Sequence, residues 1–371
     1  MMIKQIFYRI FHIVLYTILL YGCSFNENTI VRNYKNTHIS KDSVDHYIKD
    51  NMKELKVPGL SFSIINNGEV VYHNSYGYAN LEKKLPVNSE TIFEAASLSK
   101  SIFAFFVMKY VEEGKLDLDK PLYKYLPYSD IAYDERYKKI TARMVLSHRS
   151  GFPNWRENEK DKKLKIKFEP GTRFEYSGEG YQYLAMVLKK IEGGDWKLLE
   201  KSFQNKVAKP LGMNSTVFIQ NKTTRKLKAE PYDKDGHWID WENNYWYKKD
   251  DGIFVAPSSL HTNSLDFSKW MIAIMKNEHL SESSYKELLG YESKAFTSDS
   301  GTAYYYTLGF MTGDKEFKNV YFHSGSNDGF TCWYVFDKAN KWGYVLFTNS
   351  EKGVELGEKM FGYLGGMTVW K

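Results

Sequence analysis

Hydrophobic and polar positions along the chain predict strands near both ends and helices between them. Two apolar stretches, 60–65 and 70–78, flank Asn66-Asn67-Gly68, which is typical of a two-residue β-hairpin turn. Apolar runs predict four more strands, at 307–311, 320–323, 330–336 and 343–348. We therefore expect an α+β fold in which an antiparallel sheet from both ends of the chain is flanked by helices. A mostly helical subdomain, over about 98–260, is expected to be inserted between the two sets of strands.

Helical spacing of apolar residues marks four further segments. The first, 42–55, has Ser40 or Asp42 available as a cap for its free backbone N–H groups. The second, 99–113, is strongly apolar and is followed by Gly114, a residue type that is typical of helix C-termini. Shorter helices are predicted at 181–191 and 355–364.

The first residues of the chain resemble a bacterial export signal. Lys4 and Arg9 precede an apolar run at 10–20, which is too short for a membrane-spanning helix. The run ends in Leu20-Tyr21-Gly22-Cys23, which resembles a lipobox with Cys23 as the lipidated residue. An uncleaved signal anchor is the alternative, and both versions export the chain. The predicted order is a lipoprotein-type signal peptide over 1–22, a polar tether over 23–40 and a folded domain over 41–371.

Composition excludes several classes of protein. The 371 residues are 43% hydrophobic, which is enough to bury a substantial core. The formal net charge is only +6 and basic residues are interspersed with acidic ones, so no nucleic-acid-binding stripe is predicted. Cys23 and Cys332 are the only cysteines, which excludes a disulfide framework and a cysteine metal cluster. Cys332 is expected to be a small buried residue in a strand, and no metal or cofactor is predicted.

Ser97 and Lys100 are the first candidates for chemistry. They lie three residues apart where the predicted apolar helix begins, so both side chains can share one face. A serine hydroxyl is a weak nucleophile until a neighbouring base removes its proton. Free N–H groups at the start of a helix favour a developing oxyanion, and apolar neighbours would lower the pKa of Lys100 toward that of a usable base. The alternative is that Ser97 is only a helix cap.

Other groups of residues have plainer interpretations. Ser283 and Lys286 repeat the spacing within a polar helix predicted over 281–289, and we interpret them as solvated surface. The stretch YDKDGHW, 232–238, lacks the full pattern of a calcium loop and is predicted to be a turn. His148 is expected to be structural. An aromatic cluster is expected either to line a substrate cleft or to pack as an irregular loop, and it comprises Trp238, Trp241, Tyr245 and Trp246.

Four longer blocks carry a family resemblance, and they stand in a family-like order and spacing. They are IFEAASLSKSIFAFFVMKYVEEGKLDLDKPLYKYLP (92–127), MVLSHRSGFP (144–153), EPGTRFEYSGEGYQYLAMVLKKIEG (169–193) and FHSGSNDGF (322–330). Together they closely resemble the serine β-lactamase and penicillin-binding-protein superfamily. The branch that they resemble most is that of class C β-lactamases, D-Ala-D-Ala carboxypeptidases and related esterases. The resemblance implies a β-lactamase/transpeptidase-like fold and a serine hydrolase.

The resemblance also implies a role for each matching residue. Ser97 would be the acylated nucleophile and Lys100 its base partner. Tyr176 would pass the proton to the leaving group and then help to activate the water that resolves the acyl-enzyme. The strand beside the substrate would be His323-Ser324-Gly325, and the backbone N–H groups of Ser97 and Ser326 would form the oxyanion hole.

Two positions depart from the family pattern. Gly178 stands where the family usually has Asn, and glycine has no carboxamide group with which to hold a substrate amide. This departure weakens the case for amide substrates, β-lactams included. His323 stands where Lys is common, and a neutral histidine supplies less fixed positive charge for a substrate carboxylate. Some peptidases of the family use His here, so this departure is compatible with catalysis.

We therefore predict a serine hydrolase that forms an acyl-enzyme on Ser97. Its substrate is predicted to be a small-molecule or peptide acyl donor: either a cell-wall-type peptide, as for a D-amino-acid peptidase or carboxypeptidase, or a carboxylic ester. A class C-like β-lactamase is one alternative, and a catalytically inactive lipoprotein that binds cell-wall ligands is the alternative from another class. We expect an exported bacterial lipoprotein, anchored to a membrane through Cys23, with its domain outside the cytoplasm. The oligomeric state stays open.

Overall fold

The computed structural model of the chain describes residues 30–243 and 252–366. The chain divides into two units, Met1–Ile30 and Val31–Lys371, and the second is the unit described below. The predicted signal peptide and Cys23 lie outside the described residues. Within the parts of the chain that the structure describes, no helix is both long and apolar enough to cross a membrane.

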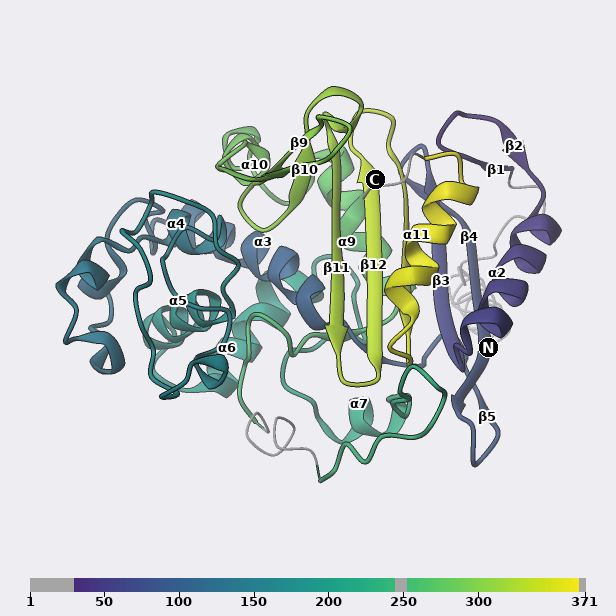
Figure 1. Cartoon of the computed structure of the whole chain (residues 1–371), viewed down its shortest axis with the longest axis horizontal. Helices are drawn as coiled ribbons and strands as arrows, with labels where there is room; N and C mark the ends of the chain where they lie inside the picture. The colour runs from purple at the N-terminus through teal and green to yellow at the C-terminus, as the bar shows by residue number, and fades with distance from the viewer. Residues whose placement is uncertain (1–29, 244–251, 367–371) are drawn as a thin grey trace, which may run out of the picture. The chain divides into compact units, whose positions relative to one another are not determined.

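The main sheet has nine antiparallel strands (Figure 1). In sheet order they are β5 (Leu85–Pro86), β4 (Glu69–Asn80), β3 (Gly59–Asn66), β13 (Trp342–Thr348), β12 (Phe330–Asp337), β11 (Val320–Asn327), β10 (Met311–Gly313), β9 (Ala303–Tyr306) and β8 (Ser293–Thr297). Early and late parts of the chain meet where β3 pairs with β13, with Phe62 opposite Leu346. The predicted α+β sheet from both ends of the chain is therefore confirmed. A separate two-stranded sheet joins β6 (Phe93–Glu94) to β7 (His261–Thr262).

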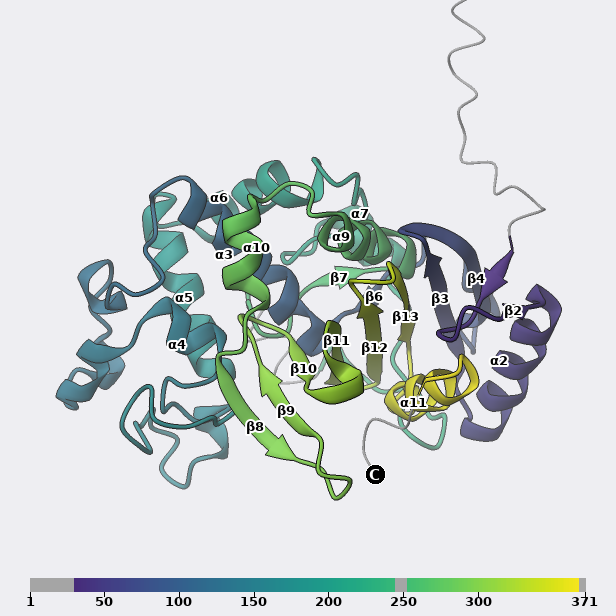
Figure 2. The same cartoon turned by 90° about the horizontal axis from the view of Figure 1, so that it is seen from above.

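Helices cover both faces of the main sheet (Figure 2). The helices of the described residues are α2 (Lys41–Leu55), α3 (Ser99–Glu112), α4 (Ala142–Leu146), α5 (Gly178–Ile191), α6 (Trp196–Phe203), α7 (Lys222–Leu227), α9 (Ser264–Lys276), α10 (Glu282–Leu289) and α11 (Gly353–Tyr363). The helices α2 and α11 pack on one face, whereas α3 and α9 pack on the other. The predicted helical insertion contains α4, α5 and α6, which lie beside α3.

Strand β12 shows how the sheet separates two hydrophobic cores. Successive side chains of a strand point to opposite faces. Trp333 and Val335 are buried with α2 and α11. Cys332, Tyr334 and Phe336 are buried in the other core, with α3 and α9. The prediction that Cys332 is a small buried residue in a strand is confirmed.

Helix α3 runs inside the second core. Of its 14 residues, 11 are buried, because the segment is apolar on all sides and not on a single stripe. Ser101, one turn into the helix, donates a hydrogen bond to the carbonyl oxygen of Gly309 at 2.6 Å and shares another with the Tyr334 hydroxyl at 2.7 Å. Contacts on every side therefore fix the N-terminal end of α3, where Ser97 and Lys100 lie.

Three predicted chain-reversal or capping signals are confirmed. The Ser40 Oγ accepts a hydrogen bond from the Ser43 N–H at 3.1 Å and caps α2. Asn67 and Gly68 join β3 to β4 with φ angles of 53° and 73°, as a two-residue hairpin turn requires. Gly114 follows α3 with a φ of 67°, in the left-handed region that glycine adopts without strain.

The segment predicted as a tether, 23–40, overlaps the folded unit, which begins at Val31. Its last part forms a small hairpin of β1 (Val31–Arg32) and β2 (His38–Ile39). Val31 is buried in the core beneath α2 and α11, and the Arg32 N–H donates to the Asn66 Oδ1 at 2.8 Å. The buried Val31 and the hydrogen bonds of its neighbours thus attach this hairpin to the domain.

The strand predicted at 307–311 is wrong, because most of this segment is the turn between β9 and β10. The Thr307 N–H donates to the Phe310 carbonyl oxygen across the turn at 2.9 Å. Gly309 has a φ of 97°, and a Cβ there would lie only 2.6 Å from the Cβ of Ala104 in α3. The apolar pattern of this segment results from its burial against α3. A buried turn can have the same apolar pattern as a buried strand.

Gly357 allows α11 to lie close to β12, and we predict that Gly357→Ala is destabilising. A Cβ at this position would lie 2.7 Å from the Cβ and Cγ of Trp333. Overpacking of this kind costs about 1 to 3 kcal/mol of the free energy of unfolding. In urea unfolding, the midpoint is expected to fall while the slope stays constant.

Gly362→Ala is the matched control for this prediction. Gly362 lies in the same helix, and a Cβ there meets no atom within 4 Å. The change is expected to leave stability unaltered or to raise it by up to about 1 kcal/mol, because alanine favours the helix over glycine. Equal effects of the two changes would show that the contact with Trp333 does not limit the packing of α11.

Candidate active site

Ser97 lies on a tight turn that leads into α3. Ala96, immediately before it, has a φ of 42°, which is a strained conformation for a residue with a Cβ. The Ala95 N–H donates to the Leu260 carbonyl oxygen at 2.7 Å, and both alanines are fully buried. The surrounding core therefore holds a strained backbone that presents the partly exposed Ser97 at the helix start.

Lys100 points back toward Ser97 from the first turn of α3. Its Nζ lies 3.2 Å from the Ser97 Oγ and donates a hydrogen bond to the Pro257 carbonyl oxygen at 3.0 Å. Only 1% of the residue is exposed. Burial lowers the pKa of Lys100 from 10.5 to about 7. A substantial fraction of this amine is therefore uncharged at neutral pH and has a free electron pair beside the serine hydroxyl.

Tyr176 contacts the same two residues from the turn before α5. The Lys100 Nζ lies 4.6 Å from the centre of its ring, and its hydroxyl forms a hydrogen bond with Ser97. Burial raises the pKa of Tyr176, and the bond to Ser97 offsets only part of this shift. Tyr176 is therefore a neutral phenol that can donate or accept a proton next to the nucleophile.

Strand β11 passes directly against the backbone of the predicted nucleophile. A Cβ on Gly325 would lie 2.6 Å from the Cys332 Sγ, 2.8 Å from the Ala95 carbonyl oxygen and 3.0 Å from the Ser97 N. Only glycine allows this approach. The next residue, Ser326, is exposed and lines a cavity. The structure thus brings together the two segments that were predicted to form the oxyanion hole.

His323 is part of this strand, but both of its ring nitrogens are already used. Its Nδ1 donates to the Ser324 carbonyl oxygen at 2.6 Å, and its Nε2 accepts from the Tyr306 hydroxyl at 2.8 Å. Burial, and then the positive charge of Lys100, lowers the pKa of His323 to about 3. His323 is therefore neutral and supplies no fixed positive charge.

Aromatic rings line the site behind Tyr176. The ring of His148 lies 4.2 Å from that of Tyr176 and 4.5 Å from that of Tyr306. Its Nδ1 accepts a hydrogen bond from the Ser177 N–H at 3.0 Å. Burial, followed by the charges of Lys100 and His323, holds the pKa of His148 well below its ordinary range. The prediction that His148 is structural agrees with this packing.

Tyr306 is a site residue that sequence reasoning missed. It lies in β9, outside all four blocks that carry the family resemblance, and it is fully buried. The strand AYYY gives no sign of which tyrosine points into the site. Pro257, which binds Lys100 through a backbone carbonyl, was also missed, because a backbone contact leaves no signal in residue type.

Gly178 has a steric explanation in this protein. A Cβ there would lie 2.9 Å from the indole ring of Trp155 and 3.0 Å from the Asn154 carbonyl oxygen. The Gly178 N–H also donates to that oxygen at 3.0 Å. The space for a side group at this position is therefore filled by the loop at 154–155, and an asparagine would not fit without moving it.

A cavity of about 360 Å³ lies beside Ser326. Its wall combines aromatic rings, including Trp155 and Trp241, with charged and polar groups such as Arg225 and Glu94. Of the predicted aromatic cluster, Trp241 lines this cavity, Trp238 is 46% exposed, and Tyr245 and Trp246 lie outside the described residues. The cavity adjoins the predicted oxyanion segment at Ser326, and its size is within the range of small-molecule sites.

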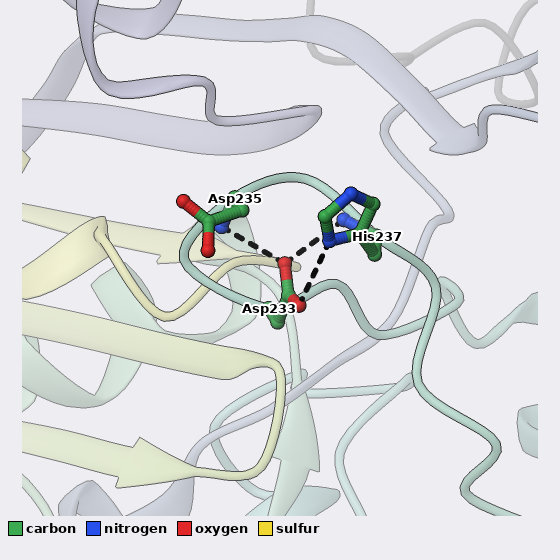
Figure 3. Close-up of side chains that lie close together, drawn as sticks. All are labelled: Asp233, Asp235 and His237. Atoms are coloured by element: carbon green, nitrogen blue, oxygen red, sulfur yellow. Dashed lines mark hydrogen bonds and ion pairs between the residues drawn. The ribbon is translucent and has the colours of Figure 1, made fainter.

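Two other sequence features have the local structure that was predicted, a turn at 232–238 and an exposed pair at Ser283 and Lys286. Asp233 holds a turn, because its Oδ1 accepts from the N–H groups of Asp235 and His237 at 2.8 and 2.9 Å, and its Oδ2 lies 3.2 Å from the His237 Nδ1 (Figure 3). The three side chains meet at the surface, and the turn itself accounts for their contacts. Ser283 and Lys286 are exposed on α10, as predicted for the second pair.

Known proteins resemble this chain over most of its length. Protein flp of Staphylococcus aureus (strain MRSA252) is 26% identical over 331 residues, which cover 84% of this chain and 64% of that protein. The putative penicillin-binding protein PbpX of Bacillus subtilis (strain 168) is 26% identical over 322 residues, covering 84% and 75%. The chain therefore spans just under two thirds of the length of the S. aureus relative.

A solved structure also resembles this chain over most of its length. The octameric penicillin-binding protein homologue from Pyrococcus abyssi superimposes with a TM-score of 0.71 and 25% identity, covering 88% of this chain and 78% of that chain. This similarity confirms the predicted β-lactamase/transpeptidase-like fold. The family described as beta-lactamase matches residues 44–364. Because that match extends over most of the chain, the protein belongs to the beta-lactamase family.

Proposed function

We propose that this protein is a serine hydrolase that forms an acyl-enzyme on Ser97 with Lys100 as the base. The observation that carries the proposal is the 3.2 Å contact between the Lys100 Nζ and the Ser97 Oγ, made by an amine whose pKa burial lowers to about 7. A base with a pKa near the working pH is the most effective in proton transfer. The family is generally one of serine hydrolases, which supports the same reaction class.

In the proposed acylation, the Ser97 hydroxyl gives its proton to the Lys100 amine and its Oγ attacks the carbonyl carbon of the substrate. The carbonyl oxygen becomes an oxyanion and accepts hydrogen bonds from the backbone N–H groups of Ser97 and Ser326. A donor of this kind is worth about 3 to 4 kcal/mol in comparable acyl transfer. The bond between the carbonyl carbon and the leaving group then breaks, and the proton held by Lys100 passes through Tyr176 to the leaving group.

In the proposed deacylation, water attacks the acyl carbon bound to Ser97. Tyr176 and Lys100 are the groups that can remove the proton of this water, because both lie beside the Ser97 Oγ. The Ser97 hydroxyl is restored when it regains a proton from Lys100. Ser97, Lys100 and Tyr176 end the cycle in their starting states, because the proton carried away by the leaving group is replaced by one from the attacking water.

The substrate that we propose is a carboxylic ester or a cell-wall-type peptide, as for a D-amino-acid peptidase or carboxypeptidase. The ester is supported by Gly178 and His323, since this site has neither a side-chain amide at 178 nor a cation at 323. The peptide is supported by relatives that are named penicillin-binding proteins. A class C-like β-lactamase is the weaker candidate, because a β-lactam is an amide that also carries a carboxylate.

We also propose that the chain is exported and held at a membrane through lipidated Cys23. This proposal rests on the lipobox-like sequence alone.

The alternative of an inactive lipoprotein that binds cell-wall ligands lacks support from the site, because Ser97, Lys100 and Tyr176 are in mutual contact.

Covalent labelling is the first test of the proposed nucleophile. We expect a fluorophosphonate probe to label the full-length chain, because an activated serine attacks phosphorus as it attacks a carbonyl. Labelling is expected to disappear in Ser97→Ala and to persist in Ser283→Ala, the serine of the second, exposed pair. A fluorescent penicillin tested in parallel separates the substrates, since labelling by both probes favours peptides and labelling by the phosphonate alone favours esters. Phosphonate labelling that survives Ser97→Ala would contradict the assignment.

The pH dependence of labelling tests the base. Below about pH 7 the Lys100 amine is protonated and cannot accept the serine proton, whereas above it the amine is free, so the labelling rate is expected to rise with a midpoint near 7. Lys100→Arg stays charged and is expected to lower the rate by about 100- to 10,000-fold and to remove the midpoint. Lys286→Arg, in the exposed pair, is expected to keep the wild-type profile. A midpoint near 7 that persists in Lys100→Arg would assign the base elsewhere.

A further inference from the structure

The proposed oxyanion hole depends on two segments that are distant in the sequence. Ser97 follows β6, whereas Ser326 lies near the end of β11. Their backbones are so close that a Cβ on Gly325 would approach the Ser97 N to 3.0 Å. In acyl transfer, a displacement of about 1 Å can cost about 100-fold in rate. The separation of these two segments therefore needs a contact that fixes it.

Glu94 makes such a contact. It lies three residues before Ser97, and its Oε2 accepts a hydrogen bond at 2.6 Å from the Nδ2 of Asn327, the residue that follows Ser326. Its other oxygen forms an ion pair with Lys228. We refer to Glu94, Lys228 and Asn327 as the Glu94 clamp. The clamp joins the segment before one oxyanion donor to the segment after the other.

The carboxylate of the clamp is charged and mostly buried, at the wall of the cavity. The side chains of Glu94 and Lys228 are 18% and 2% exposed. Burial raises the pKa of Glu94, but the charges of Lys228 and His261 and the hydrogen bonds of Lys228 and Asn327 hold it below its ordinary value of 4.5. A buried ion pair adds little net stability compared with apolar packing, and such pairs can instead fix one arrangement of the backbone.

The clamp is also attached to the loop that holds Lys100. Glu94 pairs with His261 across the β6–β7 sheet, which fixes its backbone. The Asn327 Nδ2 lies 3.4 Å from the Ser258 carbonyl oxygen, to which it also donates. The preceding residue, Pro257, accepts the hydrogen bond from Lys100. One side-chain amide thus connects the two oxyanion segments with the loop that orients the base.

We propose that Glu94 is a positioning residue that sets the width of the oxyanion hole by binding Asn327. The proposal rests on the proposed acyl-enzyme mechanism and adds a residue that does not touch the substrate carbonyl. Its specific consequence is that loss of the clamp impairs stabilisation of the oxyanion more than it impairs the fold.

The test compares two acyl donors on the full-length protein: a p-nitrophenyl ester of a short carboxylic acid and the matching thionoester. The thionoester places sulfur, a weak hydrogen-bond acceptor, where the oxyanion forms, so the ratio of the two acylation rates reports on the hole. We expect Glu94→Ala and Asn327→Ala each to slow acylation by the oxoester roughly 10- to 100-fold and to lower the ratio of oxoester to thionoester rates about tenfold. Because both changes break one contact, the double variant is expected to be at most about threefold slower than the slower single variant.

Two further variants distinguish loss of the contact between Glu94 and Asn327 from a nonspecific loss of activity. Glu94→Gln keeps an oxygen that can accept from Asn327, and we expect it to retain a larger ratio than Glu94→Ala. Glu112→Ala is the matched control at the far end of α3. The Glu112 side chain is 26% exposed and its carboxylate also accepts two hydrogen bonds, from the Ser281 N–H at 2.6 Å and the Ser284 Oγ at 2.8 Å. Both the rate and the ratio are expected to stay at the wild-type level in this control.

Melting temperatures establish first which variants are folded. A folded Glu94→Ala protein with the wild-type ratio overturns the proposal. If Glu94→Ala does not fold, Asn327→Ala, whose side chain is partly exposed, decides by the same ratio. Failure of the proposed function gives a different result, because Ser97 of the wild-type protein would then be acylated by neither ester. If only the proposal about the clamp is wrong, both esters still acylate Ser97 of the wild-type protein.

Discussion

The amine of Lys100 is buried, and among the residues that the structure describes no carboxylate forms an ion pair with it. A charged ammonium in such a place loses several kcal/mol of hydration, so its pKa falls and the neutral form becomes accessible. The neutral histidines nearby follow from the same constraint. Burial and the field of Lys100 lower the pKa values of both His148 and His323. Both histidines near the Ser97 hydroxyl are therefore neutral, and the Lys100 amine is the basic group beside it.

The fold creates this pocket by packing a helix between a sheet and a helical subdomain. Helix α3 is apolar on all sides, so its first turn enters the core together with Lys100. Strand β11 packs directly against the turn at Ser97, and only a glycine at position 325 permits this close approach. The proposed role of the Glu94 clamp is to hold these two segments at a fixed distance. Stability and proposed chemistry thus depend on the same close contacts.

Sequence reasoning identified the parts of the site that depend on residue type at short spacing. Ser97 and Lys100 share one helix face, and Tyr176 lies in a block that resembles the family, so both signals are local. Tyr306 and the Asn327 contact of Glu94 were not predicted, because they depend on strand register and on residues more than 200 positions apart. The strand expected at 307–311 failed for a related reason, since burial against α3 gives an apolar turn the pattern of a strand.

The proposed chemistry requires that Lys100 is an uncharged amine in a substantial fraction of molecules at neutral pH. The most direct measurement is an NMR titration of the full-length protein with isotopically labelled lysines, in which the Lys100 signal is assigned by its loss in Lys100→Arg. We predict that this signal titrates with a midpoint near pH 7, because burial lowers its pKa to about 7. A midpoint near the ordinary value of 10.5 would contradict this prediction and remove the proposed base.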